Sequence, residues 1–374
     1  MRHNHIAGLD SWRAALLAGG LFFHGTMLQP NHPLFHVIEA ISTSFRMAAF
    51  FAIAGFLAAR SLSRQHASDW LTGRSLRIGV PALFGIAVIS PAIHSMLVAG
   101  LPSDRSANVL PFEWHHLWFL FALLLYQGVA FLIVGHVASR DGARVVARLR
   151  NWGQCAVIAA LAGLTLFLMV VTVWIVLRIA PPALQPMLME TRLIVGYLPL
   201  YLFGMALASS RALRETMLRR TAVLASILLL AVCGYGAWRL GIAPRYAAAA
   251  GAAVEMQLRF LLGALCPSAA VLVVLSSAMR IPASGAWVTR LCAASFTIYI
   301  VHFPLLIATN LILARYHAPP LIGYAVAIGV VGLLSYGIHA CIVRRSVLAS
   351  MLLNGRMPQM RWQAPPLPAL PEPR

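Results

Sequence analysis

Residues 154–177 read QCAVIAALAGLTLFLMVVTVWIVL, a run of 24 residues without a charged side chain. A helix of about 20 apolar residues crosses the ~30 Å hydrocarbon core of a bilayer, so this run predicts a transmembrane helix. Nine further stretches of the chain predict the same element. The ten predicted spans are 11–29, 41–60, 77–100, 115–138, 154–177, 192–209, 221–240, 256–278, 291–313 and 321–344.

The composition of the 374-residue chain agrees with this prediction. Hydrophobic residues make up 60% of the sequence and charged residues 10%, whereas soluble domains carry about a quarter charged residues. A soluble enzyme is therefore excluded. The five cysteines lie in apolar runs without a CxxC pair, and no residues have metal-ligand spacing, so we expect no disulfide framework and no metal site. The predicted fold class is an all-α integral membrane protein, with about ten transmembrane helices in one bundle.

The arginines predict the orientation of the chain. All 29 basic residues are arginines and the formal net charge is +19, a balance that can indicate nucleic-acid binding. Their placement argues otherwise, because 21 lie on one side of the predicted spans, seven lie on the other, and Arg46 lies inside a span. Positive charge gathers on the cytoplasmic side of membrane proteins. We therefore expect both termini in the cytoplasm and no nucleic-acid partner.

The chain shows one predicted domain and a tail. There is no internal repeat, no glycine-rich phosphate loop and no connection long enough to fold by itself. We assign residues 1–345 to a transmembrane domain and residues 346–374 to a cytoplasmic tail. The last ten residues, 365–374, contain five prolines, a composition typical of a disordered segment.

The first predicted span holds the most informative polar residues, which are Asp10, Arg13 and His24. Eleven residues at 100° each make three turns and about 20°, so Arg13 and His24 share a helix face. Asp10 is one turn before Arg13 and can pair with it. His24 lies about 16 Å further along the helix, deep in the bilayer, where an imidazole can exchange protons near neutral pH. The alternative is a neutral histidine that is hydrogen-bonded to a neighbouring helix.

Three further arginines are candidate binding residues. Arg74 and Arg77 stand one turn apart, a spacing at which two guanidinium groups can grip a phosphate. The alternative is that they are ordinary cytoplasmic anchors of a span. Arg46, inside the second span, either pairs with a carboxylate such as Glu39 or recognises an anion in a cavity.

Two further histidines are candidate substrate-binding residues. His302 lies midway along the ninth span, next to Pro304, which interrupts helical hydrogen bonding. His116 begins the fourth span beside His115, where both rings can line a mouth that faces the periplasm. His94 and His339 lie in spans without an accompanying pattern, and we interpret them as structural.

Arg13-x10-His24 and Arg74-x-x-Arg77 resemble the membrane acyltransferase 3 family. Further similar stretches follow in order along nearly the whole chain, namely LDSWR at 9–13, SFRMAAFFAIAG at 44–55, RIGVP at 77–81, HLWFL at 116–120, YLP at 197–199 and ASFTIYIVHFP at 294–304. The resemblance implies a multi-pass protein of the bacterial inner membrane that moves acyl groups from a cytoplasmic donor to sugars outside. It is greatest to the branch that succinylates osmoregulated periplasmic glucans.

The resemblance also implies roles for single residues. His24 is then the catalytic histidine, Arg13 supports it with Asp10 alongside, and Arg74 and Arg77 bind the donor. We expect no bound cofactor, an acyl-CoA such as succinyl-CoA as cosubstrate, and a periplasmic glucan or other glycan as acceptor. We take Arg46 as the candidate for the free carboxylate of a succinyl group.

The sequence leaves two mechanisms and three functions open. His24 either deprotonates the acceptor hydroxyl or forms an acyl-histidine intermediate. The acceptor is either a periplasmic glucan or another surface glycan, for example lipopolysaccharide or exopolysaccharide that receives acetyl groups. A secondary transporter is the third possibility, because buried charges and a kinked helix suit one as well.

Overall fold

The computed structural model describes residues 6–30, 32–102, 109, 113–137, 140–242, 248–283 and 285–356, and these residues contain no β-strand. The main helices are α1 (Ala7–His24), α2 (Pro33–Leu62), α3 (Ala67–Phe84), α4 (Ser90–Gly100), α6 (Trp118–Val137), α8 (Gln154–Ile179), α11 (Leu198–Ser209), α13 (Thr221–Ala237), α14 (Ala248–Phe260), α15 (Cys266–Arg280), α16 (Ala286–Arg315) and α17 (Pro320–Ile338). The shorter helices are α7 (Arg140–Asn151), α9 (Gln185–Leu188), α10 (Thr191–Gly196), α12 (Arg211–Met217) and α18 (Val347–Asn354). Single 3₁₀ turns cover His115–Leu117 and Pro182–Leu184, and π-helical turns cover Gly85–Ile89, Trp238–Ile242, Leu261–Leu265 and His339–Val343.

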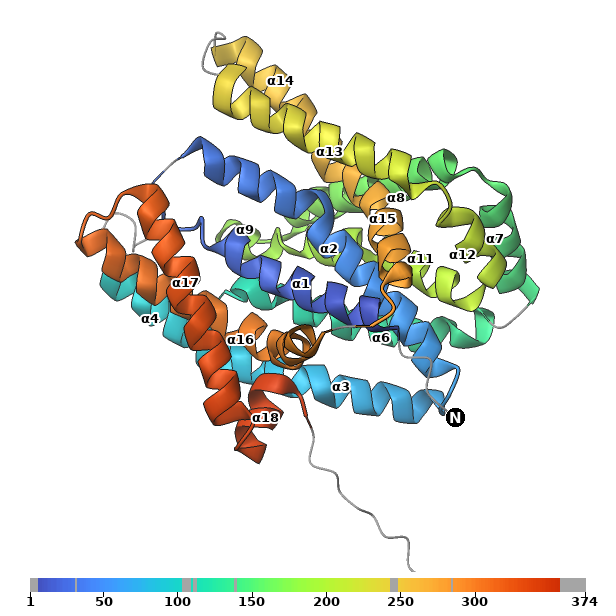
Figure 1. Ribbon diagram of the computed structural model, residues 1–374, viewed down its shortest axis with the longest axis horizontal. Coiled ribbons are helices and arrows are strands. Elements are labelled where there is room, and N and C mark those ends of the chain that lie inside the picture. Colours follow the sequence, from blue (N-terminus) through green and yellow to red (C-terminus); the bar gives the residue numbers. More distant parts are fainter. Residues whose placement is uncertain are drawn as a thin grey trace, which may run out of the picture.

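The described residues contain nine helical segments that are long and apolar enough to cross a membrane. They are Pro33–Leu62, Ala67–Gly100, His115–Val134, Gln154–Ile179, Thr191–Ser209, Thr221–Gly241, Gly251–Arg280, Ala286–Arg315 and Pro320–Val343. This confirms the predicted all-α membrane fold. The predicted span 11–29 has no counterpart among these segments; it corresponds to α1, which has only 18 residues and carries Asp10, Arg13 and His24. α1 nevertheless lies inside the bundle, against α2, α15 and α16 (Figure 1).

Several helices begin earlier than their apolar runs. α2 begins at Pro33 rather than at residue 41, and the third span begins at Ala67 rather than at residue 77. Their additional turns carry polar residues such as Glu39, Asp69 and Arg74, which the apolar pattern does not include. These helices are therefore longer than the apolar runs from which the spans were predicted.

α2 lies at the centre of the bundle, in contact with α1, α11 and α15 (Figure 1). Its crossing with α11 depends on glycines on both helices. A β-carbon at Gly55 would overlap the carbonyl oxygen of Tyr201, and a β-carbon at Gly204 would overlap that of Ala52. Small residues of this kind let two helix backbones approach closely within a membrane. The neighbouring Phe51 and Ile53 are fully buried.

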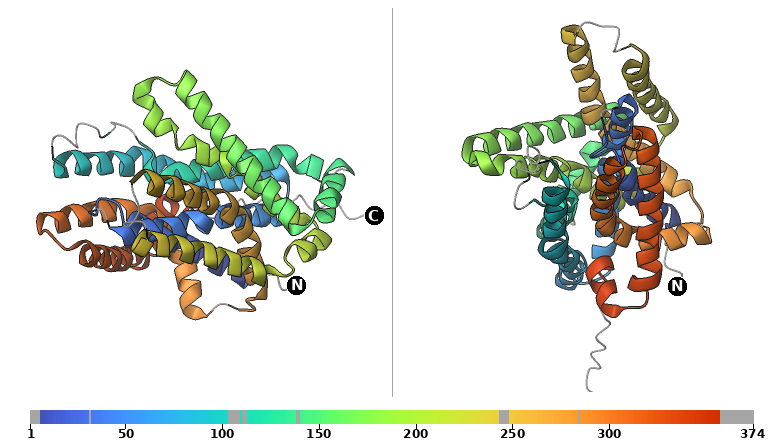
Figure 2. Two further views of the ribbon diagram at one scale, coloured as in Figure 1. Left: turned by 90° about the horizontal axis from the view of Figure 1, so that it is seen from above. Right: turned by 90° about the vertical axis from the view of Figure 1, so that its left-hand side faces the viewer.

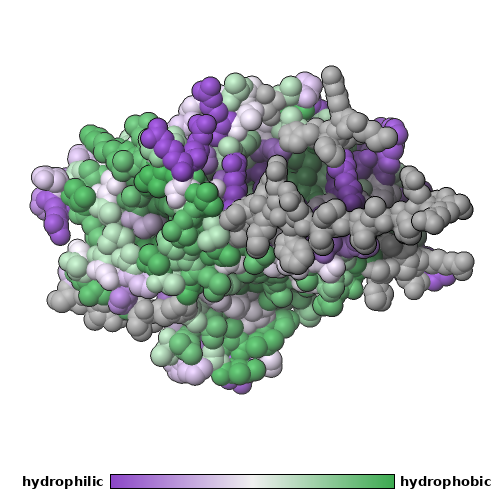
Figure 3. Space-filling view, turned by 90° about the horizontal axis from the view of Figure 1, so that it is seen from below, coloured by the Kyte–Doolittle hydropathy of each residue, from purple (hydrophilic) through white to green (hydrophobic). Residues whose placement is uncertain are grey.

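The outward faces of the peripheral helices are apolar. On α8, Leu164, Phe167, Val170 and Trp174 are all exposed at helical spacing. Apolar side chains also cover much of the face seen in Figure 3, and the ends of α13 and α14 extend beyond the other helices (Figure 2). An exposed apolar surface of this kind suits contact with lipid chains rather than water.

The chain after residue 345 continues as a helix before the description stops. Ser346 caps the start of α18, because its hydroxyl accepts a hydrogen bond from the Ala349 N–H at 3.2 Å. α18 packs against α3 and α16. Only the first part of the predicted tail is therefore described. The proline-rich segment predicted at 365–374 lies outside the described residues.

Candidate active site

Three histidines from separate parts of the chain meet beside the last turn of α1. Between ring centroids, His24 is 5.4 Å from His302 on α16 and 6.4 Å from His116 in the turn before α6. His116 and His302 are 5.4 Å apart. The ring of Phe303 stacks on His116 at 4.8 Å and meets His24 edge-on at 5.0 Å. The sequence singled out each of these histidines but did not indicate that they form one histidine cluster.

Two of these rings contact backbone carbonyls of α16, and one of these carbonyls is left free by Pro304. Pro304 has no N–H, so the carbonyl of Ile300, four residues earlier, lacks its donor within the helix. His116 Nε2 lies 3.3 Å from that carbonyl oxygen, and His302 Nδ1 lies 2.7 Å from the carbonyl oxygen of Tyr299. Because a carbonyl only accepts, His116 carries its hydrogen on Nε2 and His302 carries its hydrogen on Nδ1. The other nitrogen of each neutral ring is then an acceptor.

Several nitrogens of the histidine cluster have no partner. Nδ1 of His24, Nδ1 of His116 and Nε2 of His302 are buried and make no hydrogen bond with the described residues. Buried polar atoms without a partner are uncommon in folded proteins. The cluster can therefore accept a hydrogen bond or a proton from a hydroxyl group. Among the residues that the structure describes, no three His, Cys, Asp or Glu side chains group as a metal site.

Arg46 on α2 adds a positive charge to the histidine cluster. Its Nε donates to the Ser42 hydroxyl at 2.8 Å, and its guanidinium lies 5.3 Å from the ring centroid of Phe23. A β-carbon at Gly20 would lie 3.2 Å from Arg46 Nη1 and 3.6 Å from His302 Nε2, so this glycine leaves room for both groups.

Glu39 is not the partner of Arg46. It accepts a hydrogen bond from the Thr26 hydroxyl at 3.1 Å and lies 3.7 Å from the ring of His36. Within the described part of the chain, no carboxylate oxygen lies within ion-pair distance of Arg46. An unpaired guanidinium inside a membrane bundle is costly, and a bound anion would offset that cost.

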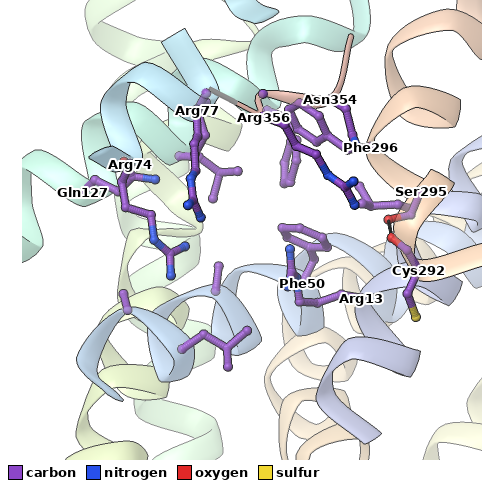
Figure 4. Close-up of a pocket in the computed structure, with 18 of the residues that line it drawn as sticks. Arg13, Phe50, Arg74, Arg77, Gln127, Cys292, Ser295, Phe296, Asn354 and Arg356 are labelled. Atoms are coloured by element: carbon purple, nitrogen blue, oxygen red, sulfur yellow. Dashed lines mark hydrogen bonds between the residues drawn. The ribbon is translucent and has the colours of Figure 1, made fainter. Parts of the chain in front are cut away.

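A cavity of about 630 Å³ opens at the other end of α1. Among the described residues, four arginines line it, Arg13, Arg74, Arg77 and Arg356, and no carboxylate does. All four extend into the same space (Figure 4). Arg13 Nη1 donates to Asp10 at 3.1 Å, as the sequence predicted, and Arg74 lies over the ring of Trp70 at 5.9 Å. This arginine cavity has the charge that a ligand with several phosphates requires.

Four helices connect the arginine cavity to the histidine cluster. Each contributes a strip of residues at helical spacing. The strips are Arg13, Leu17, Gly20 and His24 on α1, Ala54, Phe50 and Arg46 on α2, Leu123 and Phe119 on α6 with His116 in the turn before it, and Phe296, Tyr299 and His302 on α16. The rings of Phe50 and Phe119 are 4.6 Å apart, and Phe119 is 5.3 Å from Tyr299. Tyr299 in turn lies 5.3 Å from His116. Phe50, Phe119 and Tyr299 thus form an aromatic layer between the two sites.

The turn before α6 carries a further pair of polar groups. His115 Nδ1 lies 3.1 Å from a carboxylate oxygen of Glu113. This hydrogen bond holds the pKa of the Glu113 carboxyl below its usual range. His115 has a φ of +44°, a conformation that is strained for a residue with a β-carbon. The strained turn sets His116, the next residue, into the histidine cluster.

The structure thus places the predicted residues in two groups. Asp10, Arg13, Arg74 and Arg77 lie at the arginine cavity, and His24, Arg46, His116 and His302 lie at the histidine cluster. Sequence reasoning missed Arg356, because it assigned the whole segment after residue 345 to a tail. The Asn354-Gly355 pair, a common helix-ending sequence, is the signal that would have indicated a folded element there.

Comparison with known families decides the class of protein. The family model described as an acyltransferase domain, that of acyltransferase 3, matches residues 6–340. The chain belongs to the acyltransferase 3 family. With its nine apolar helical segments among the described residues, this acyltransferase 3 protein is a multi-pass membrane acyltransferase. The family predicted from the sequence is confirmed, and the matched region ends before α18.

Relatives of this acyltransferase 3 protein include glucans biosynthesis protein C. The protein from Escherichia coli K12 strain DH10B is 31% identical over 138 residues, which is 31% of this chain and 36% of the relative. The proteins of the same name from E. coli SMS-3-5 and from E. coli O139:H28 are 30% identical over the same length. The aligned region therefore spans only about a third of these relatives. No solved structure shows a significant match.

Proposed function

We propose that this chain is an inner-membrane O-acyltransferase that transfers an acyl group from cytoplasmic acyl-CoA to a hydroxyl group of a periplasmic glucan. One observation carries the proposal. A single face of α1 holds Arg13 at the arginine cavity and His24 at the histidine cluster. Family membership supports acyl transfer, and the names of the relatives support a glucan acceptor.

The donor binds with its nucleotide end in the arginine cavity. Arg74 and Arg77 hold phosphate groups there, and Arg13, fixed by Asp10, adds a third cation. The pantetheine arm passes along Leu17 and the aromatic layer toward the histidine cluster. Eleven residues of α-helix rise about 16 Å between Arg13 and His24, so the donor must bridge that distance. A long, thin arm that ends in a thioester suits this passage.

His24 then acts as the general base. It removes the proton from a glucan hydroxyl, and the oxygen attacks the carbonyl carbon of the thioester. A new C–O ester bond forms, the C–S bond breaks, and the coenzyme A thiolate leaves with the proton that His24 took. His116 and His302 accept hydrogen bonds from other hydroxyls of the acceptor. In the alternative mechanism, a His24 nitrogen attacks the thioester first and the glucan oxygen then displaces the acyl group.

Arg46 selects the acyl group. Its guanidinium lies beside Gly20, as does His302 Nε2, and has no carboxylate partner among the described residues. A succinyl group carries a free carboxylate that can occupy this position, whereas an acetyl group carries none. We therefore infer that succinyl-CoA is the preferred donor.

Mass spectrometry of cell glycans, with and without the gene, tests the proposed function. We expect deletion to remove a succinyl mass from the periplasmic glucans and plasmid-borne expression to restore it. Loss of an acetyl mass from lipopolysaccharide or exopolysaccharide instead would contradict both the donor and the acceptor. Unchanged glycans, together with donor-independent substrate uptake into membrane vesicles, would favour a transporter and contradict acyl transfer.

A further inference from the structure

The C-terminal helix α18 ends at the arginine cavity, although it lies beyond the region that the family shares. The Ser350 carbonyl accepts from the N–H groups of Gly355 and Arg356 and so closes the helix. Gly355 has a φ of +62°, a left-handed conformation that favours glycine. The chain therefore turns sharply just before Arg356.

The same turn docks on the helix that carries the predicted donor-binding pair. Gly355 is buried, and a β-carbon there would overlap the carbonyl oxygen of Arg77. This close backbone contact fixes the end of α18 against α3. Asn354, Gly355 and Arg356 consequently line the arginine cavity together with Arg74 and Arg77.

Arg356 begins beside Arg77, and its side chain extends away from the pair toward Ser295, on the other side of the cavity (Figure 4). It is exposed, and neither Arg356 nor Arg77 forms an ion pair with a carboxylate among the described residues. Guanidinium groups crowded without counter-charge repel one another, and an anion between them removes that repulsion. Cations on two sides of one space suit a ligand whose phosphates are separated, as the diphosphate and the 3′-phosphate of coenzyme A are.

We propose that Arg356 is a donor-binding residue and that α18 is part of the acyl-CoA site, with Gly355 as its positioning residue. The inference rests on the proposed function, because it names a further ligand of the same donor. Arg74 and Arg77 bind one phosphate group of coenzyme A, and Arg356 binds another across the cavity. The region that the family model matches would then hold the nucleotide only in part.

Binding of coenzyme A to the purified full-length protein tests this proposal. We expect Arg356→Gln to raise the Kd about tenfold or more, because a charge-assisted hydrogen bond is lost. Arg356→Lys should recover part of the affinity. Gly355→Ala should weaken binding in the same direction, since the added carbon forces the turn away from Arg77. Arg345→Gln is the matched control, because Arg345 is exposed and lies outside the arginine cavity.

A second readout separates ligand binding from a structural role. With succinyl-CoA and succinyl-pantetheine as alternative donors, Arg356→Gln should reduce the preference for the full donor about tenfold. An equal loss with both donors would assign Arg356 a structural role and overturn the proposal. Parent-like coenzyme A binding by Arg356→Gln, with weakened binding by Arg74→Gln, would overturn it while the proposed function stands. A parent protein that binds no coenzyme A would overturn both.

Discussion

At the scale of single residues, Arg46 carries the prediction about the acyl group. We expect Arg46→Leu to lower the preference for succinyl-CoA over acetyl-CoA about tenfold or more, because the leucine offers no charge-assisted hydrogen bond to the free carboxylate. Competition between the two labelled donors in isolated membranes measures this ratio. Arg178→Leu is the control, because Arg178 lies on α8 over the ring of Trp174. An unchanged ratio in Arg46→Leu would show that another group selects the acyl chain.

A second prediction at this scale concerns the substitution of Gly20. Its missing side chain leaves room for Arg46 Nη1 and His302 Nε2. Gly20→Ala places a methyl group 3.2 Å from Arg46, so the guanidinium must shift. We expect about a tenfold loss of acyl transfer at unchanged protein abundance, because small displacements at a reacting centre are costly. Gly128→Ala, where a β-carbon meets nothing within 4 Å, should behave as the parent; a similar loss there would point to a general effect of methyl groups.

At the scale of the elements, Pro304 in α16 leaves the Ile300 carbonyl free to contact His116. The substitution Pro304→Ala returns an N–H to the helix, and this donor competes with His116 Nε2 for the Ile300 carbonyl. We expect acyl transfer to fall several-fold while the Tm of the protein in detergent does not fall. Parallel activity and thermal-unfolding measurements check both halves of this prediction. A lowered Tm with proportionate loss of activity would mean that Pro304 serves the fold instead.

The elements also show what the sequence could and could not predict. The length of each apolar run predicted the spans, and the 100° step of a helix predicted that Arg13 and His24 share one face of α1. The histidine cluster was beyond prediction because it depends on how α1, α16 and the turn before α6 cross. The tautomer of His116 could not be predicted either, because the Ile300 carbonyl that Pro304 leaves free identifies the protonated nitrogen only once its neighbour in space is known.

At the scale of the whole molecule, the described chain begins and ends at the same cavity. Arg13 near the start and Arg356 at the end both line it, and the arginine count predicts that this end faces the cytoplasm. A membrane-impermeant maleimide should therefore label Leu184→Cys, between α8 and α10, in intact spheroplasts. Arg345→Cys should be labelled only after lysis. The reverse pattern would invert the orientation and would place the donor site on the wrong side.

The predicted orientation also bears on how the two sites of the bundle would work together. In the proposed function, a donor site on one side and a proton-accepting cluster deep in the bundle would allow transfer across the bilayer without release of the donor. The aromatic layer of Phe50, Phe119 and Tyr299 lies between them.

The central claim, that His24 is the base for acyl transfer, is tested most directly by transfer of labelled succinyl groups from succinyl-CoA to glucan. The comparison needs membranes that contain equal amounts of the parent, His24→Ala and His94→Ala, a histidine outside the cluster. We predict that His24→Ala loses about 10²-fold or more of the rate and that His94→Ala keeps it. Transfer by His24→Ala at the parental rate would contradict the account.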